Sequence, residues 1–205
     1  YKRQPLDGVK VIDLSTIVSG PLAGSLLGDQ GADVIKIESP LRPDNARFMG
    51  PLRGENGALF AAANRSKRSL ALDLKKDGSK AIIYELIKNS DVIIDNFRPG
   101  ILKKLGLEYE DVKKYNPRII QLSITGYGVD GPYSKRRVYD PLIQATAGIA
   151  NAQSIDGTPK FVKTLMCDKI TSLTAAQSVT AALYAREKTD EGQKINLSML
   201  DTALY

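Results

Sequence analysis

Short apolar runs alternate with helix-forming segments along this sequence, and no other feature constrains the fold as strongly. Residues 9–14 have the character of a buried strand, Ser19-Gly20-Pro21 opens a helix to about Asp29, and residues 32–38 form a second apolar run. A strand, a helix and a strand within roughly 30 residues make a βαβ unit. The two strands of such a unit are parallel, because the helix crosses back over the sheet.

The same alternation continues through the rest of the chain. We expect further strands at 69–74, 91–95, 118–125 and 194–199, helices at 76–89, 140–150 and 168–187, two short helices after Gly100, and mostly loop at 39–64. The pattern predicts an open, mostly parallel, Rossmann-like α/β sheet flanked by helices. Ligands of such sheets bind beyond the carboxyl ends of the strands. The loops after residues 14, 74, 95 and 125 are therefore expected to hold the functional site.

The chain contains no histidine and one cysteine, Cys167. A Ser-His-Asp or Cys-His catalytic unit therefore cannot be assembled from it, and neither can a histidine metal site. We predict no metal, and catalysis would depend on carboxylate, lysine, tyrosine, hydroxyl, thiol or backbone groups. Without a histidine nearby, we interpret Cys167 as a small residue of the core.

Charge and cysteine content limit the partners and the compartment. The 29 basic residues exceed the 23 acidic ones by six, which suits an anionic ligand or a solvated basic surface equally well. Nucleic acid is not expected, because basic and aromatic residues are not interleaved. A single cysteine suits a reducing compartment. We see neither a secretory leader nor an apolar run of about 18 residues, so we predict a cytoplasmic protein without a membrane segment.

Two features suit anion binding. The turn at residues 19–24 is rich in small residues but matches neither G-x-G-x-x-G nor a P-loop. Its free N–H groups could meet an anion, although helix packing explains the small residues too. Cations that phosphates could use follow several strand ends, with surface solvation as the alternative for each: Lys75, Arg98, Lys103, Lys104, Arg136 and Arg137.

Asp168 stands where the long C-terminal helical pattern begins. Its carboxylate could serve as a helix N-cap that accepts a backbone N–H of the first turn. Alternatively, the helix dipole and those N–H groups could hold it ionised, as a carboxylate nucleophile requires. The residues by themselves leave both interpretations open.

Ordered segments spread over the whole chain carry a family resemblance. They are residues 5–14 (PLDGVKVIDL), 20–21 (GP), 27–38 (LGDQGADVIKIE), 64–69 (NRSKRS), 72–75 (LDLK), 96–100 (NFRPG) and 123–128 (SITGYG), together with Asp168. In these segments the sequence resembles the family III CoA-transferases, which include formyl-CoA transferase, carnitine-CoA transferase and the α-methylacyl-CoA racemases. The resemblance implies that residues 1–205 are an N-terminal CoA-binding domain running into a linker to a C-terminal half. It also implies an interlaced homodimer for the complete protein.

The resemblance further implies a mechanism and a set of site residues. Asp168 falls on the family's catalytic aspartate, which forms an acyl anhydride and then an aspartyl-CoA thioester. Coenzyme A would be a substrate rather than a tightly bound cofactor, and small carboxylic acids would be its acyl partners. CoA contacts are expected from Val18, Ser19, Leu72, Asp73, Leu74, Lys75, Asn96, Phe97, Arg98, Lys104, Arg137, Val138 and Tyr139.

At three positions the chain has a different residue from particular members of this family. Val18 stands where formyl-CoA transferase has glutamine, which argues against formate/oxalate exchange. Ser39 replaces an arginine, which leaves Arg42 to meet the CoA phosphates. The racemases carry histidine at the position of Tyr139, so the sequence favours transfer over racemisation. An acyl-CoA racemase, a CoA-ester lyase of the same fold and a non-catalytic CoA-ester-binding fragment are the alternatives.

Overall fold

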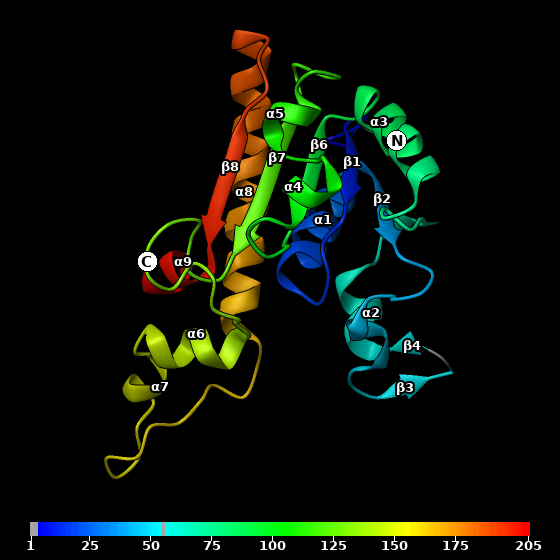
Figure 1. Cartoon of the computed structure of the whole chain (residues 1–205). Helices are drawn as coiled ribbons and strands as arrows, with labels where there is room; N and C mark the ends of the chain where they lie inside the picture. The colour runs from blue at the N-terminus through cyan, green and yellow to red at the C-terminus, as the bar shows by residue number, and fades with distance from the viewer. Residues whose placement is uncertain (1–3, 55) are drawn as a thin grey trace.

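The computed structural model describes residues 4–54 and 56–205, and a six-stranded parallel sheet organises them (Figure 1). The strands are β1 (Lys10–Asp13), β2 (Asp33–Glu38), β5 (Lys67–Ala71), β6 (Val92–Asp95), β7 (Ile120–Thr125) and β8 (Lys194–Ser198), in the spatial order β5-β2-β1-β6-β7-β8. The order of the strands reverses between β1 and β6, as in Rossmann-like domains. The predicted open α/β sheet is confirmed.

Helices cover both faces of this sheet. α1 (Ser19–Asp29) and α8 (Met166–Thr189) pack on one face, and α3 (Asp77–Lys88), α4 (Ile101–Leu105) and α5 (Tyr109–Val112) pack on the other. Successive strand residues point to opposite faces. In β6, Ile94 therefore joins the core under α1 and α8, whereas Ile93 joins the core under α3. Burial on both sides explains why the central strands β6 and β7 consist mostly of buried apolar residues.

Two groups of short elements lie at the carboxyl edge of the sheet, which faces downward in Figure 1. On the right are the 3-10 helix η1 (Asn45–Phe48), the hairpin of β3 (Leu52–Arg53) and β4 (Asn56–Gly57), and α2 (Ala58–Ala63). On the left are α6 (Asp140–Thr146) and α7 (Ile149–Ala152), with α9 (Met199–Leu204) close by. The expectation of mostly loop at 39–64 was wrong, because these elements are too short to show a periodic pattern.

Two other elements differ from the sequence prediction by more than one or two residues at an end. The helix expected at 140–150 is divided, because Gly148 adopts a left-handed backbone conformation with φ of +80° between α6 and α7. β5 lies at Lys67–Ala71 rather than at 69–74. Residues 72–75 consequently leave the sheet and become part of the wall of a cavity.

Candidate functional site

A cavity of about 210 Å³ opens at the carboxyl edge of the sheet, beside the reversal between β1 and β6. We call it the switch-point cavity. The loops after β1, β6 and β7, the segment before α6 and the first turn of α8 contribute to its wall. Open α/β sheets bind ligands at this kind of position, and the sequence pointed to the same strand ends. The wall includes Thr16, Ile17, Ser19, Asn96, Phe97, Arg98, Thr125, Gly126, Arg136, Arg137, Val138, Tyr139 and Asp168.

A second cavity of about 380 Å³, the outer cavity, adjoins the first, and both Thr16 and Phe97 line the two cavities. Its wall combines apolar side chains with the cations Arg42 and Lys75. Ser39, at the position of the missing family arginine, also lines it. The two cavities are therefore neighbours along the sheet edge, and basic side chains line both of them.

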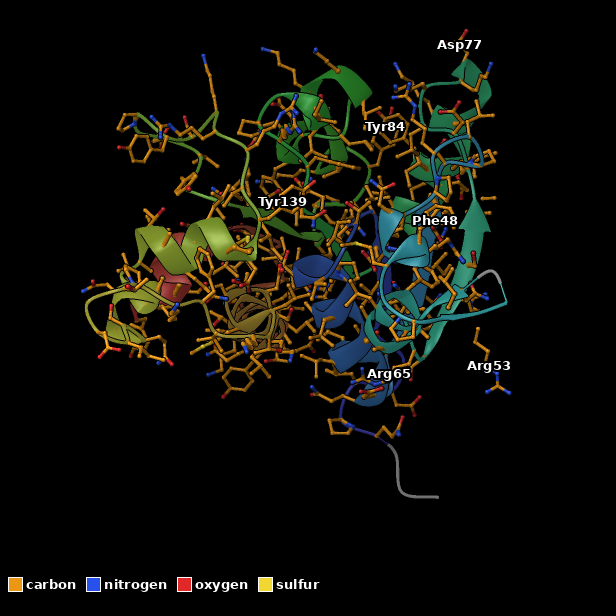
Figure 2. All side chains as sticks on the ribbon, turned by 90° about the horizontal axis from the view of Figure 1, so that it is seen from below. Phe48, Arg53, Arg65, Asp77, Tyr84 and Tyr139 are labelled. Atoms are coloured by element: carbon orange, nitrogen blue, oxygen red, sulfur yellow. The ribbon has the colours of Figure 1, made fainter. Side chains whose placement is uncertain are left out.

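The structure brings together most of the residues that the sequence nominated. Ser19, Asn96, Phe97, Arg98, Arg137, Val138, Tyr139 and Asp168 surround the switch-point cavity, and Leu72, Asp73, Leu74 and Lys75 line the outer one. Figure 2 looks onto this edge and shows Tyr139 toward its middle, where α6 begins. Three nominated residues line neither cavity: Val18 is buried where α1 begins, and Lys103 and Lys104 are exposed on α4.

Asp168 is not a helix cap. α8 begins at Met166, so Asp168 is its third residue, and no side chain of the N-cap position bonds to the first turn. Instead the backbone N–H of Asp168 donates to Oδ2 of Asp140, at 3.0 Å. The carboxylate of Asp140 thus satisfies a free donor of the first turn of α8 from a different helix.

The carboxyl of Asp168 titrates far above an ordinary aspartate. It is 8% exposed, and burial raises its pKa from 3.8 to about 7, with the negative charge of Asp140 as the second cause. Hydrogen bonding from the backbone and side chain of Ser19 lowers this pKa only in part. The expectation that the helix start holds Asp168 ionised was therefore wrong. Loss of solvation and a neighbouring carboxylate outweigh the helix terminus.

Cys167 precedes this carboxyl and is fully buried in the core under α8, as predicted. Burial raises the pKa of its thiol to about 11, and Asp140 and Asp168 add to the effect. A thiol with so high a pKa stays protonated near neutral pH and is a poor nucleophile. Of these two neighbours, only Asp168 lines the switch-point cavity.

Asp140 is held in place by a buried network that the sequence analysis missed. Nε2 of Gln144 donates to Oδ1 of Asp140 at 2.5 Å, and Oε1 of Gln144 accepts the N–H of Val162 at 2.8 Å. The network joins α6 to the long segment before α8. Aspartate is common at the first position of a helix. The sequence therefore did not indicate that Asp140 would be buried next to a second carboxyl group.

The turn between β1 and α1 brings Ser19 beside Asp168. A Cβ on Gly20 would lie 2.3 Å from the Cβ of Ser15, so only glycine permits the backbone to fold back this closely. The hydroxyl of Ser172 in α8 donates to the carbonyl of Ser19 at 2.8 Å, and it also lies 2.7 Å from the carbonyl oxygen of Asp168. α1 and the start of α8 are thereby held against each other at the cavity.

The described residues offer no group of three or more metal-ligating side chains that could hold an ion. No helix in the described part of the chain is long and apolar enough to cross a membrane.

Fold and site together define an α/β domain whose ligand crevice at the switch point contains a desolvated carboxyl. The sequence profile of CoA-transferase family III matches residues 6–205, and the chain belongs to this family. The resemblance drawn from the sequence is confirmed.

Named relatives agree with this assignment. The chain is 41% identical over 202 residues to an acetyl-CoA:oxalate CoA-transferase of Acetobacter aceti, covering 98% of this chain and 52% of that protein. It is 38% identical to the human succinyl-CoA:glutarate CoA-transferase, covering 97% and 46%. The solved structure of a CAIB/BAIF family protein from Brucella suis superposes with a TM-score of 0.94 at 39% identity, covering 99% and 55%. The chain thus spans about half the length of the curated relatives it matches.

Proposed function

We propose that the complete protein is a CoA-transferase that moves coenzyme A from an acyl-CoA donor to a carboxylic acid, with Asp168 as the nucleophile. The observation that carries the proposal is the place of Asp168. It is the only carboxyl among the described residues that line the switch-point cavity, and it stands at the carboxyl edge of the sheet. Cationic side chains for a phosphorylated ligand share the same wall.

The first half-reaction moves coenzyme A onto the enzyme. A carboxylate oxygen of Asp168 attacks the thioester carbonyl carbon of the donor, the carbon–sulfur bond breaks, and CoA leaves as a thiolate. This gives a mixed anhydride between Asp168 and the donor acyl group. The thiolate then attacks the side-chain carbonyl of Asp168, which releases the donor acid as a carboxylate and leaves an aspartyl-CoA thioester.

The second half-reaction is the same chemistry in reverse. The acceptor carboxylate attacks the carbonyl of the aspartyl-CoA thioester, which expels CoA thiolate and forms a new anhydride. The thiolate attacks the acceptor acyl carbon, which releases acceptor acyl-CoA and restores the carboxylate of Asp168. Atoms and charge balance without ATP, a metal or an oxidant, because each step exchanges one activated acyl derivative for another.

The environment of Asp168 favours these intermediates. Burial and the charge of Asp140 both destabilise its carboxylate, as the pKa of about 7 reflects. The anhydride and the thioester are neutral at this residue, so their formation removes the repulsion from Asp140 and the unfavourable burial of charge. A destabilised reactant anion next to neutral intermediates lowers the barrier to attack.

We place the nucleotide part of CoA in the outer cavity and its thioester in the switch-point cavity. Arg42 and Lys75 offer charge to phosphates in the first, and Arg98 and Arg137 do so in the second. Phe97, which lines both, would contact the arm between them. Leu72, Asp73, Leu74, Asn96, Val138 and Tyr139 complete this proposed contact set.

For the substrates we propose a chemical class, and for the assembly a homodimer. Two relatives are named for transfer to oxalate or glutarate, so we propose a small carboxylic acid as the acceptor here. Residues 1–205 would be the N-terminal CoA-binding domain of a cytoplasmic, interlaced homodimer. The exposed Leu173 and Tyr184 lie on one face of α8, three helical turns apart, and suit burial under further protein.

The test is to replace Asp168 by alanine in the complete protein. Transfer should fall by about 10³-fold or more, since the only group that carries the acyl unit is lost. Hydroxylamine added during turnover of the wild type should convert the aspartyl thioester into a hydroxamate, which peptide mass spectrometry would locate at Asp168. Transfer that persists within a few-fold in the variant would remove Asp168 from this role. Exchange of the substrate α-proton with solvent, without acyl exchange, would identify a racemase instead.

A further inference from the structure

The turn between β1 and α1 contains a strained residue on the wall of the switch-point cavity. Ile17 has φ of +71°, in the left-handed region that favours glycine. For a β-branched side chain this conformation is a genuine outlier. Strain of this kind persists only where the surroundings impose it, and it concentrates at functional sites.

Three side chains impose the conformation by holding three consecutive residues of the turn. Lys36 donates from Nζ to the carbonyl of Ser15 at 2.8 Å. Asn96 accepts the N–H of Thr16 at 2.8 Å and donates to its carbonyl at 2.7 Å. The N–H of Ile17 donates to both carboxylate oxygens of Asp44, at 3.0 and 3.1 Å.

Asp44 is itself fixed by a buried set of charges. It pairs with Lys36 at 3.1 Å, and next to them Lys67 pairs with Asp13 at 2.6 Å. All four side chains are at most 2% exposed. Burial alone would raise the pKa of Asp13, but Lys67 and Lys36 outweigh it and hold that pKa below its ordinary value. Two acids and two lysines thus compensate one another beneath the turn, which makes Asp44 a rigid anchor.

The direction of the chain at Ile17 decides where Ser19 lies. Only Val18 separates the two residues, and Ser19 hydrogen-bonds to the carboxyl of Asp168 at the cavity wall. The close approach at Gly20 and the bridge from the Ser172 hydroxyl to the Ser19 carbonyl hold the chain beyond Ser19, so a change at Ile17 has to be absorbed within residues 17–19. A shift of the turn would therefore change the hydrogen bonding to the reactive carboxyl.

We propose that Asp44 is a positioning residue that, through its contact with the N–H of Ile17, holds the turn in its left-handed conformation and so places Ser19 against Asp168. The inference rests on the proposed role of Asp168 and extends it to a residue outside the switch-point cavity, on the wall of the outer cavity. Asp44, at the start of η1, would thus orient the turn between β1 and α1 in addition to packing beneath it.

The experiment is a double-mutant cycle in the complete protein. Asp44→Ala should lower kcat by about 10- to 100-fold, the loss expected when a catalytic contact is misplaced by about an ångström. Glycine adopts the left-handed conformation without strain. The same Asp44→Ala change should therefore cost less than about threefold in the Ile17→Gly background, because that backbone no longer needs to be held.

A matched control separates positioning from general loss of stability. Asp91 also pairs with a buried cation, Arg186 at 2.9 Å, and accepts a backbone N–H, from Lys10 at 2.8 Å, but it lies at the opposite edge of the sheet. Asp91→Ala should lower the melting temperature and leave kcat within about threefold at temperatures where the protein is folded. If Asp44→Ala does not fold, Asp44→Asn keeps one acceptor oxygen and should show the same dependence on the Ile17 background with a smaller loss.

The outcomes are distinguishable from a failure of the proposed function. An equal loss from Asp44→Ala in both Ile17 backgrounds, or no loss in either, overturns the positioning role while the wild type still yields a hydroxamate at Asp168. If the wild type yields no hydroxamate there, the proposed nucleophile falls and the positioning role falls with it.

Discussion

The carboxyl of Asp168 makes the stability of this domain depend on pH in a direction that a substitution can isolate. Its pKa is raised from 3.8 to about 7, chiefly by burial. The folded state therefore binds this proton more tightly than the unfolded state does. The linked stabilisation is complete below the unfolded pKa of 3.8 and is lost as the pH rises through about 7. Asn at this position cannot titrate, so Asp168→Asn lacks the effect.

The magnitude follows from the two pKa values. At 1.36 kcal/mol for each pKa unit, the full difference between 3.8 and about 7 corresponds to about 4 kcal/mol. About 2.5 kcal/mol of this stabilisation is lost between about pH 5 and about pH 8, according to the linkage relation. The free energy of unfolding of the wild type should fall by about that much more than that of Asp168→Asn over the same interval.

Urea unfolding at a series of pH values measures the difference, and a second buried carboxyl supplies the control. Burial raises the pKa of Asp95 to about 6. Above about pH 6.5 the stability of Asp95→Asn should therefore run nearly parallel to the wild type, whereas that of Asp168→Asn should diverge from it. Parallel curves for Asp168→Asn over the whole interval would refute the claim that Asp168 is a desolvated acid.

Two further substitutions test the walls of the site. Asp140→Asn removes the charge beside Asp168 but keeps an oxygen that can accept the N–H of Asp168. The pKa of Asp168 should therefore fall, and the acidic limb of the rate–pH profile should move to lower pH. An unmoved limb in initial-rate measurements would exclude this electrostatic coupling. Gly126→Ala places a Cβ 2.1 Å from Cγ1 of Val138. This overpacking should lower the free energy of unfolding by about 1–3 kcal/mol, as measured by urea unfolding. An unchanged urea midpoint would mean that the Val138 side chain moves aside at no cost.

Local patterns were enough to predict the scaffold and the sheet edge at which the cavities lie. Apolar strands and amphipathic helices are encoded within windows of a few residues, and crossover connections force the strands to be parallel. Helix boundaries were harder to predict where a single glycine interrupts the helix. Gly148 divides the helix expected at 140–150, and the periodic pattern of apolar residues does not indicate this break. The family resemblance then supplied the residues around the cavities, which the structure gathered with the exceptions of Val18 and Lys104.

The chemical state of the site was not readable from local sequence. Asp168 at a helix start suggested a stabilised anion, yet its pKa is raised. Burial is the larger cause, and the second is Asp140, which lies 28 residues away in the chain and directly beside Asp168 in space. The conformation of Ile17 likewise depends on Asp44, which is 27 residues away. Desolvation and charge interactions sum over everything that packs around a group, whatever its position along the chain.

By itself, then, the sequence determined a parallel α/β sheet and the edge of that sheet at which the cavities lie. Tertiary structure decided which carboxyl is desolvated and which turn is strained. The reason is physical: secondary structure follows from short-range periodicity and backbone sterics, whereas burial, charge pairing and strain exist only after distant segments have been brought into contact.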